Sequence, residues 1–203
     1  MGSFILAVTD ESTARGWRHT RTLTAWVDVD TVVGDVVLRT KRAEVDCVTA
    51  KPYMHVGILV HDLEEALGRM SEVLDVTFTP PLRAKMDGLQ VGTETQAPEL
   101  YLAYSQQGPP YYELIETQKD GLWGRQHGEG LHHVGLWEPE CHHQLRRMSS
   151  LGIEAEAVQY LPDGQIGVAY FRPDGFYGTR IEIVNQIMQD AMEEWFRTGN
   201  PPV

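Results

Sequence analysis

A six-residue segment that occurs twice sets the strongest limit on how this chain folds. HVGILV begins at His55, and HVGLWE begins at His133. Each copy is followed by a stretch with helix-like spacing of apolar residues and then by several short strand-like stretches. Each copy ends on a strand-like segment that contains a glutamate, Glu113 in YYELIE and Glu182 in TRIEIVN. An internal repeat of this kind predicts two copies of one structural module.

The order of segments within each copy predicts a βαβββ module, and two such modules make an α+β protein. In the first copy, HDLEEALGRMSEVL has apolar residues at helical spacing, with Asp62 as the expected N-cap. In the second copy, CHHQLRRMSSLG is expected to form a helix that ends at Gly152. The predicted divisions are a strand-rich extension (1–50), a first module (51–120), a linker loop (121–130), a second module (131–186) and a C-terminal helix with tail (187–203).

Side-chain alternation predicts which of these residues share a face of the sheet, because successive side chains of a strand point to opposite sides. In the first copy, Val56, Ile58 and Val60 are all apolar and should lie under a helix. His55, Gly57 and Leu59 should therefore face the other side of the sheet. His133 takes the same place in the second copy, and its neighbour His132 should point away. Glu113 and Glu182 lie between or beside apolar residues of their strands and should face the same side as the two histidines.

Composition excludes several classes of function. The chain has 203 residues and a formal net charge of −12, which repels nucleic acid phosphates. It contains no apolar run of about eighteen residues, so no membrane-spanning helix is expected. The start MGSFILAVTDES lacks the basic region of a secretory signal, and Cys47 and Cys141 form no CxxC pair. These features predict a cytoplasmic protein with two reduced cysteines that acts on a small molecule.

The two ends of the chain carry separate expectations. TLTAWVDVD (22–30) and VVGDVVLRT (32–40) alternate apolar and polar residues and predict two strands of an added hairpin, with a turn at Gly34. From residue 187 onward, IMQDAMEEWFRTGN has an apolar stripe at helical spacing. This stripe predicts a helix that either covers the sheet or joins a partner subunit, so a homodimer is one expected assembly.

The segments HVGILVHDLEEAL, YYELIE, GLHHVGLWEPE and GTRIEIVN, which together span about residues 52–186, resemble the vicinal oxygen chelate proteins. The likeness is nearest to the glyoxalase I and methylmalonyl-CoA epimerase branch. It implies that the paired modules form a curved, partly open, barrel-like mixed sheet around a metal site. It also implies the metal ligands, which are His55, Glu113, His133 and Glu182. The extension before the first module has no counterpart in this resemblance.

Two imidazoles and two carboxylates make a neutral site for one divalent metal ion. Such mixed nitrogen and oxygen ligands suit zinc, nickel, cobalt, manganese or iron, and the sequence does not distinguish among them. Four protein ligands leave room for oxygens of a small oxygenated metabolite. The resemblance therefore implies an isomerase, epimerase or lyase that works through a metal-stabilised enolate. Glu182 first and Glu113 second are the candidate bases, and the candidate pocket residues are Tyr101, Tyr104, Tyr170 and Arg172.

Two other functions fit the same pattern. A non-haem iron dioxygenase of the extradiol type needs two histidines and one carboxylate, here His55, His133 and Glu182, so Glu113 as a fourth ligand counts against it. A metal-free binding or drug-resistance protein of the same fold has no need to keep four ligands. Metal content and the binding of a hydrophobic compound would separate these functions.

Overall fold

The computed structural model describes residues 3–14, 17–28 and 51–202. The chain divides into two compact units, residues 1–50 and residues 51–203. In the first unit, β1 (Ser3–Ala14) and β2 (Trp17–Asp28) pair as a two-stranded antiparallel sheet.

Most of the predicted strand TLTAWVDVD lies within β2. The strand predicted at 32–40 and the turn predicted at Gly34 lie outside the described residues. So does Cys47, one of the two cysteines considered above.

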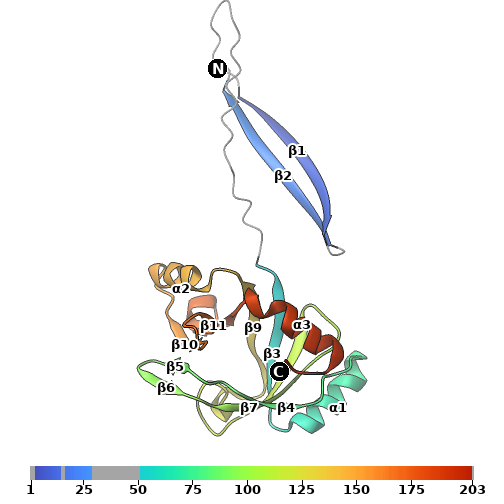
Figure 1. The fold of residues 1–203 in the computed structure, drawn as a ribbon, viewed down its shortest axis with the longest axis vertical. Coiled ribbons are helices and arrows are strands. Elements are labelled where there is room, and N and C mark those ends of the chain that lie inside the picture. The colour runs from blue at the N-terminus through green and yellow to red at the C-terminus, as the bar shows by residue number, and fades with distance from the viewer. Residues whose placement is uncertain (1–2, 15–16, 29–50, 203) are drawn as a thin grey trace, which may run out of the picture. The chain divides into compact units, whose positions relative to one another are not determined.

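The second unit is built on a 10-stranded mixed sheet with the strand order β4-β7-β8-β3-β9-β12-β11-β10-β5-β6 (Figure 1). The strands are β3 (Tyr53–Val60), β4 (Leu82–Lys85), β5 (Leu89–Val91), β6 (Glu94–Gln96), β7 (Glu99–Tyr104), β8 (Tyr111–Glu116), β9 (Gly130–Glu138), β10 (Ala155–Tyr160), β11 (Ile166–Phe171) and β12 (Arg180–Asn185). The helices are α1 (Leu63–Leu74), α2 (Cys141–Ser150) and α3 (Gln189–Thr198), with short 3-10 helices η1 (Arg125–His127), η2 (Pro173–Phe176) and η3 (Gln186–Met188).

The repeat seen in the sequence is visible in the strand order. One half contributes β3-β8-β7-β4 outward from the centre of the sheet, and the other contributes β9-β12-β11-β10. In each half the first strand is parallel to its neighbour and the remaining pairs are antiparallel. Antiparallel pairing of β3 with β9 joins the halves. The predicted α+β fold, a curved mixed sheet with a C-terminal helix, is therefore confirmed.

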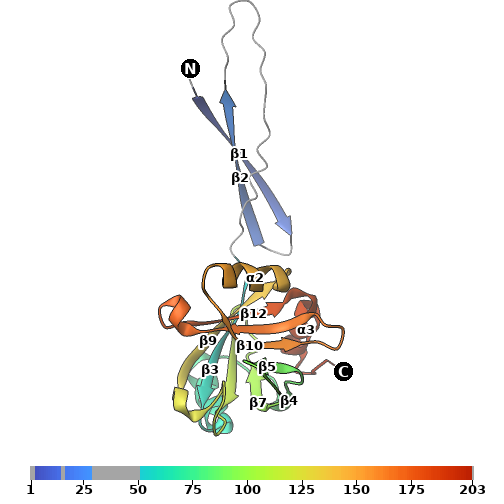
Figure 2. The same ribbon diagram turned by 90° about the vertical axis from the view of Figure 1, so that its left-hand side faces the viewer.

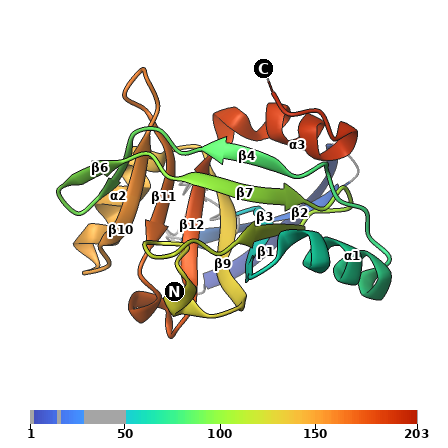
Figure 3. The same ribbon diagram turned by 90° about the horizontal axis from the view of Figure 1, so that it is seen from below.

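The β5-β6 hairpin departs from the repeat. It belongs to the first half of the chain, yet β5 pairs antiparallel with β10 of the second half (Figure 2). Because β4 and β5 are consecutive in the chain but lie toward opposite ends of the sheet, the sheet must curl (Figure 3). Gly88, in the short connection between them, has φ +74°, and a Cβ atom there would lie 2.8 Å from the carbonyl oxygen of Tyr160. Only glycine suits this position.

The helices α1 and α2 cover the convex side of the sheet, one on each half (Figure 1). As predicted, α1 begins at Asp62, whose side chain accepts a hydrogen bond from the backbone N–H of Glu65 at 2.9 Å. Leu63 of α1 packs against Val60 and Leu114. Helix α2 ends at Ser150 with Leu151 as its C-cap, and Gly152, which has φ +77°, follows at the predicted end of the helix.

The helix α3 covers the concave side. Its Trp195 and Phe196 are buried against Tyr104 and Tyr111 of the first half. The apolar stripe predicted at the C-terminus therefore covers the sheet of its own chain. Among the described residues, no helix combines the length and hydropathy needed to cross a bilayer.

Candidate metal centre

Four neighbouring strands at the centre of the sheet, β8, β3, β9 and β12, each carry one of the predicted ligands. Cross-strand pairing arranges these ligands in two rows, each with a glycine between a glutamate and a histidine. The rows are Glu113, Gly57, His133 and Glu182, Gly135, His55. The rows are equivalent by the repeat, and both rows lie on the concave face.

The glycines explain why the repeated motif reads His-Val-Gly. A Cβ atom on Gly57 would lie 2.0 Å from Cε1 of His133, and one on Gly135 would lie 2.3 Å from Cε1 of His55. Real non-bonded contacts are never this short, so any larger residue would displace the ring. Each glycine therefore makes room for the imidazole of the other half.

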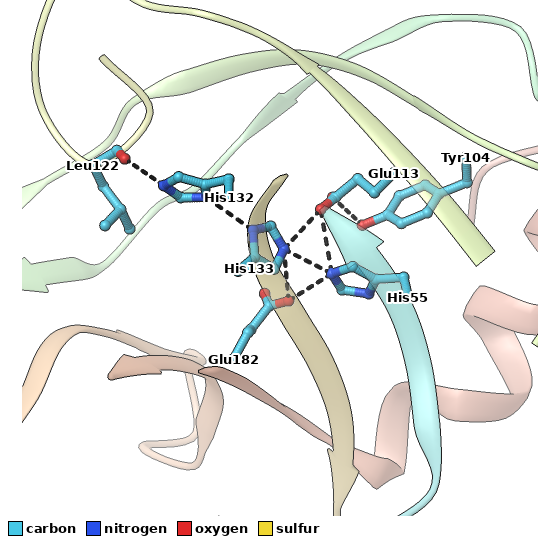
Figure 4. Close-up of polar contacts among 7 residues, drawn as sticks. All are labelled: His55, Tyr104, Glu113, Leu122, His132, His133 and Glu182. Atoms are coloured by element: carbon cyan, nitrogen blue, oxygen red, sulfur yellow. Dashed lines mark hydrogen bonds and ion pairs between the residues drawn. The ribbon is translucent and has the colours of Figure 1, made fainter. Parts of the chain in front are cut away.

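The ligand atoms of these four residues, called here the four-donor cluster, all lie within 4.8 Å of one another. The two Nε2 atoms of His55 and His133 are 2.8 Å apart (Figure 4). Oε2 of Glu182 lies 2.7 Å from Nε2 of His55 and 3.2 Å from Nε2 of His133. For Oε2 of Glu113 the corresponding distances are 3.3 and 3.1 Å. All four residues are at most 5% exposed.

Burial and mutual charge set the protonation of the cluster in the metal-free protein. Burial disfavours a charge on His55, but Glu182 and Glu113 outweigh it and raise the pKa of that imidazole to about 10. Burial likewise opposes the charge on Glu113, yet His55 and His133 lower its pKa to about 2. The pKa of Glu182 is lowered for the same reasons. The two carboxylates therefore favour protonated imidazoles in the cluster when no metal ion is bound.

A divalent metal ion fits the cluster. Donors about 2.1 Å from one ion lie about 3.0 to 3.4 Å apart, depending on the coordination angle. The nitrogen–oxygen separations of 2.7 to 3.3 Å fall close to that range. Within residues 51–202, Oε2 of Glu113 and of Glu182 accepts no hydrogen bond. These buried oxygens face two imidazoles across a space that a cation would satisfy.

A tyrosine stands beside each carboxylate on the next strand outward. Tyr104 of β7 pairs with Glu113, and its hydroxyl donates a hydrogen bond to Oε1 of that residue. Tyr170 of β11 pairs with Glu182 in the same way across its strands. Both tyrosines are buried, and burial first and the carboxylates second raise the pKa of each phenol well above its usual value. Both phenols therefore stay protonated and able to donate hydrogen bonds.

A tryptophan packs edge-on against each of these tyrosines. Trp195 of α3 contacts Tyr104 with ring centroids 5.2 Å apart, and Trp123 of the linker loop contacts Tyr170 at 5.6 Å. Both indoles are buried, and within residues 51–202 neither indole Nε1 atom has a hydrogen-bond partner. Two buried donors therefore flank the cluster, one in each half.

Two residues expected in the pocket lie elsewhere. The hydroxyl of Tyr101 donates to Glu64 of α1 at 2.6 Å, and the guanidinium of Arg83 lies 4.5 Å from its ring centroid. Tyr101 differs from Tyr104 by an odd number of positions, so strand alternation puts it on the convex face. Arg172 is exposed beyond the end of β11, in a surface cavity of about 310 Å³ lined by residues of the α2–β10 and β11–β12 loops. Neither Tyr101 nor Arg172 therefore lies beside the four metal-ligand candidates.

The expectation that His132 points away is also wrong. The pairing of β3 with β9 shifts register between Gly57 and Ile58, which face His133 and Leu131. His132 is the extra residue of this β-bulge, where alternation is lost. Its ring is buried beside His133, with the two Nδ1 atoms 2.9 Å apart (Figure 4). Burial and the neighbouring positive groups lower the pKa of His132 to about 3.

The chain is similar to a known protein family in sequence and to solved structures in fold. A family model described as the glyoxalase/bleomycin resistance protein/dioxygenase superfamily matches residues 54–170. A hypothetical protein from Bacillus halodurans has a similar structure, with a TM-score of 0.53 and 17% identity over 68% of this chain and 95% of that chain. No curated protein matches this chain in sequence.

Two further solved structures resemble the chain. A methylmalonyl-CoA epimerase in complex with methylmalonyl-CoA and NH4+ has a TM-score of 0.50 and 16% identity over 68% of this chain and 95% of its own. A variant of the Streptomyces coelicolor epimerase in complex with 2-nitronate-propionyl-CoA has a TM-score of 0.50 and 17% identity, with the same coverage. At these identities the likeness establishes a shared fold.

Proposed function

Because this chain belongs to the glyoxalase/bleomycin resistance protein/dioxygenase superfamily, we propose that its four-donor cluster binds one divalent metal ion and that the protein is an enzyme. The proposed activity is that of an isomerase, epimerase or lyase on a small oxygenated metabolite. The proposed chemistry is removal of a proton next to a carbonyl group.

The convergence of the cluster carries the proposal. Four residues that are far apart in the sequence bring one ligand atom each to within 4.8 Å of the others, in a site that water barely reaches. Burying two imidazoles and two carboxylates without a function would cost stability, because replacement by packed apolar residues is often neutral or stabilising. Perturbed charged groups in a buried cluster are typical of functional sites.

When bound, a divalent ion supplies Lewis acidity, which makes a proton next to a carbonyl group easier to remove. The chain must then provide the base within hydrogen-bond reach of that proton. We assign this role to Glu182 first and to Glu113 second. A tyrosine hydroxyl interacts with each of these carboxylates, Tyr104 with Glu113 and Tyr170 with Glu182. In this step the proton moves to the Glu182 carboxylate, and the electron pair of the broken C–H bond moves toward the carbonyl oxygen.

The aromatic side chains suit an oxygenated substrate. Tyr104 and Tyr170 are protonated donors beside the carboxylates, and the indole N–H groups of Trp123 and Trp195 are buried donors with no partner in the described chain. Buried donors gain most when a ligand supplies the missing acceptor. These rings also keep water from the site, which strengthens its electrostatic effects.

The proposed substrate is a small oxygenated metabolite. The epimerase relatives bind coenzyme A thioesters, but they support a shared fold only. The net charge of −12 modestly disfavours such polyanions. A dioxygenase would need only three of the four ligands, and the placement of Glu113 beside both histidines favours the four-ligand site.

Metal content tests the first part of the proposal. The purified protein should contain close to one divalent metal ion per chain by elemental analysis. His55→Ala or His133→Ala should remove most of it, because each histidine lies about 3 Å from every other nitrogen or oxygen donor in the cluster. His142→Ala, on the exposed face of α2, is the matched control and should leave metal content unchanged. Metal-free protein that also takes up no zinc, nickel, cobalt, manganese or iron on titration would defeat the proposal.

Proton exchange tests the base. In deuterated solvent, the wild-type protein should exchange the proton next to the carbonyl of its substrate, found by screening small oxygenated metabolites. Glu182→Gln should slow this exchange by about 10²- to 10⁴-fold, the usual contribution of a positioned base. Glu113→Gln is the paired variant. If it slows exchange more than Glu182→Gln at equal metal occupancy, the base is Glu113.

A further inference from the structure

We propose that His132 is a positioning residue that fixes the tautomer and the ring orientation of His133, so that Nε2 of His133 reaches the cluster with a free electron pair. The contacts form one chain (Figure 4). Nε2 of His132 lies 2.9 Å from the backbone oxygen of Leu122, and Nδ1 of His132 lies 2.9 Å from Nδ1 of His133. The inference rests on the metal-binding part of the proposed function.

The hydrogen-bonding capacity of each atom in this series of contacts determines where the ring protons of His132 and His133 lie. A carbonyl oxygen can only accept, so Nε2 of His132 must carry a proton and donate it to Leu122. Nδ1 of a neutral His132 then has a lone pair and accepts. The proton between the two rings therefore belongs to Nδ1 of His133. A neutral His133, the form that can bind a metal ion, then has its free electron pair on Nε2. Unprotonated Nε2 is the form of histidine that binds a metal ion.

The opposite arrangement is disfavoured by burial. If His132 donated to His133 as well as to Leu122, it would be a cation. His132 is only 6% exposed, and within residues 51–202 its hydrogen-bond contacts are another imidazole and a carbonyl oxygen, with no carboxylate among them. Burying an unpaired charge in this way is costly. It would also place the proton of His133 on Nε2, the atom that faces the carboxylates.

The backbone oxygen of Leu122 is held in place by the linker loop. The backbone N–H of Gln118 donates to the oxygen of Trp123 at 2.8 Å, and the N–H of Arg125 donates to the oxygen of Gln118 at 2.9 Å. Leu122 and Trp123 are themselves buried. The loop between the modules thus supplies a fixed acceptor that orients His132, which orients His133.

The first half of the site has no equivalent device. Met54 takes the position of His132 in the repeat, and it is a buried core residue on the concave side. Within the described residues, Nδ1 of His55 is buried and has no hydrogen-bond partner. The chain itself therefore offers a comparison, because one cluster histidine has a partner on its outer nitrogen and the other does not. Partners of this kind typically contribute 10- to 100-fold in metal affinity.

Three variants test the proposal by competition titration with zinc. His132→Met gives the second half the residue that the first half already has, and it should weaken zinc binding by about 10- to 100-fold. His132→Asn keeps an acceptor at the position of Nδ1, and its affinity should stay close to that of the wild type. Met54→Leu is the matched control and should leave the affinity unchanged. Circular dichroism and thermal melting of each metal-free variant verify that it is folded.

Nuclear magnetic resonance supplies a readout that a purely structural role would not change. In zinc-loaded protein labelled with ¹⁵N, the ring proton of His133 should be bonded to Nδ1 and should show coupling across the hydrogen bond to Nδ1 of His132. A proton bonded to Nδ1 of His132 instead would overturn the proposal. So would equal zinc affinity in His132→Met and wild type, or equal losses in His132→Met and His132→Asn. Wild-type protein that binds no zinc or other divalent metal ion would defeat the proposed function as well, which separates the two failures.

Discussion

The two halves of the candidate metal centre present the same donors to the cluster but support them differently. His55, Glu113 and Tyr104 of the first half match His133, Glu182 and Tyr170 of the second by strand position and pairing. Next to these equivalent residues the sequence has diverged. Backbone pairing therefore preserves the donors, while the surrounding side chains are free to differ.

The differences lie in what packs behind each donor. In the first half, Tyr111 pairs with His55, and Phe196 of α3 packs against that tyrosine at a centroid distance of 4.7 Å. In the second half, the equivalent of Tyr111 is Arg180, which pairs with His133 and binds Glu156 at 3.0 Å. The first half is thus covered by the buried aromatic side chains of α3, and the second by polar contacts and the linker loop. The two halves present the same donor atoms, but different neighbouring side chains hold them in place. We therefore expect the halves to differ in how firmly they orient the metal-binding side chains.

The largest expected effect concerns the apolar cover of the first half. Phe196→Ala should lower the free energy of unfolding by about 3 to 5 kcal/mol, because it empties a fully buried aromatic position between Tyr104 and Tyr111. Urea unfolding followed by fluorescence measures the change. Ile187→Ala, at a side chain 67% exposed, is the control and should change stability by less than about 0.5 kcal/mol. A loss no larger than that of the control would mean that α3 does not support this half.

The glycine pair tests the symmetry of the donors. Gly57→Ala should displace the ring of His133, and Gly135→Ala should displace the ring of His55, because the added Cβ atoms would overlap those rings. We expect each to lower metal affinity by about 10- to 100-fold, or about 1.4 to 2.7 kcal/mol. Competition titration with zinc measures the change.

Gly68→Ala is the control for the glycine variants, since nothing lies within 4 Å of a Cβ atom at this exposed position of α1. It should leave metal affinity unchanged and raise stability by about 0.5 to 1 kcal/mol, because alanine favours helix. If only one of the two cluster glycines proves sensitive, the halves differ at the donors and not merely in their support.

The smallest expected effect concerns the tyrosine hydroxyls. Tyr104→Phe removes the donor to Oε1 of Glu113 and should destabilise the protein by about 1 kcal/mol. Tyr170→Phe, beside Glu182, should cost a similar amount if the halves are equivalent here. Chemical denaturation of both variants in parallel gives the comparison. A stability difference above about 1 kcal/mol between them would extend the asymmetry to the carboxylates.

The repeat made the fold and the convergence of the four donors predictable. Two HVG strands and two glutamate strands in the same order specified the paired modules, and the family match confirms the resemblance to vicinal oxygen chelate proteins. Strand alternation then placed Leu59 on the concave face and Val60 under α1, as observed. Regular pairing is what makes such predictions work, since it keeps the period of two intact.

The predicted side-chain positions that differ from the structure lie mostly where regular strand pairing ends. His132 sits in a β-bulge, which the sequence does not reveal, and the bulge turned an expected outward residue into a partner of His133. Arg172 follows the last residue of β11, so its direction is set by the turn into η2. Tyr101 was predictable: its parity relative to Tyr104 was enough to exclude it. Pairing of the β5-β6 hairpin with the second half depends on tertiary packing, which no local pattern encodes.

That exchanged hairpin has a consequence for how the protein can be divided. The first module supplies β5, which pairs with β10 at the outer edge of the second module. A polypeptide that ended after the first module would leave one edge of β5 without a partner strand, and a polypeptide that began at the second would expose the outer edge of β10. The two modules therefore share one continuous sheet, and neither is a self-contained folding unit, although the repeated sequence suggests two.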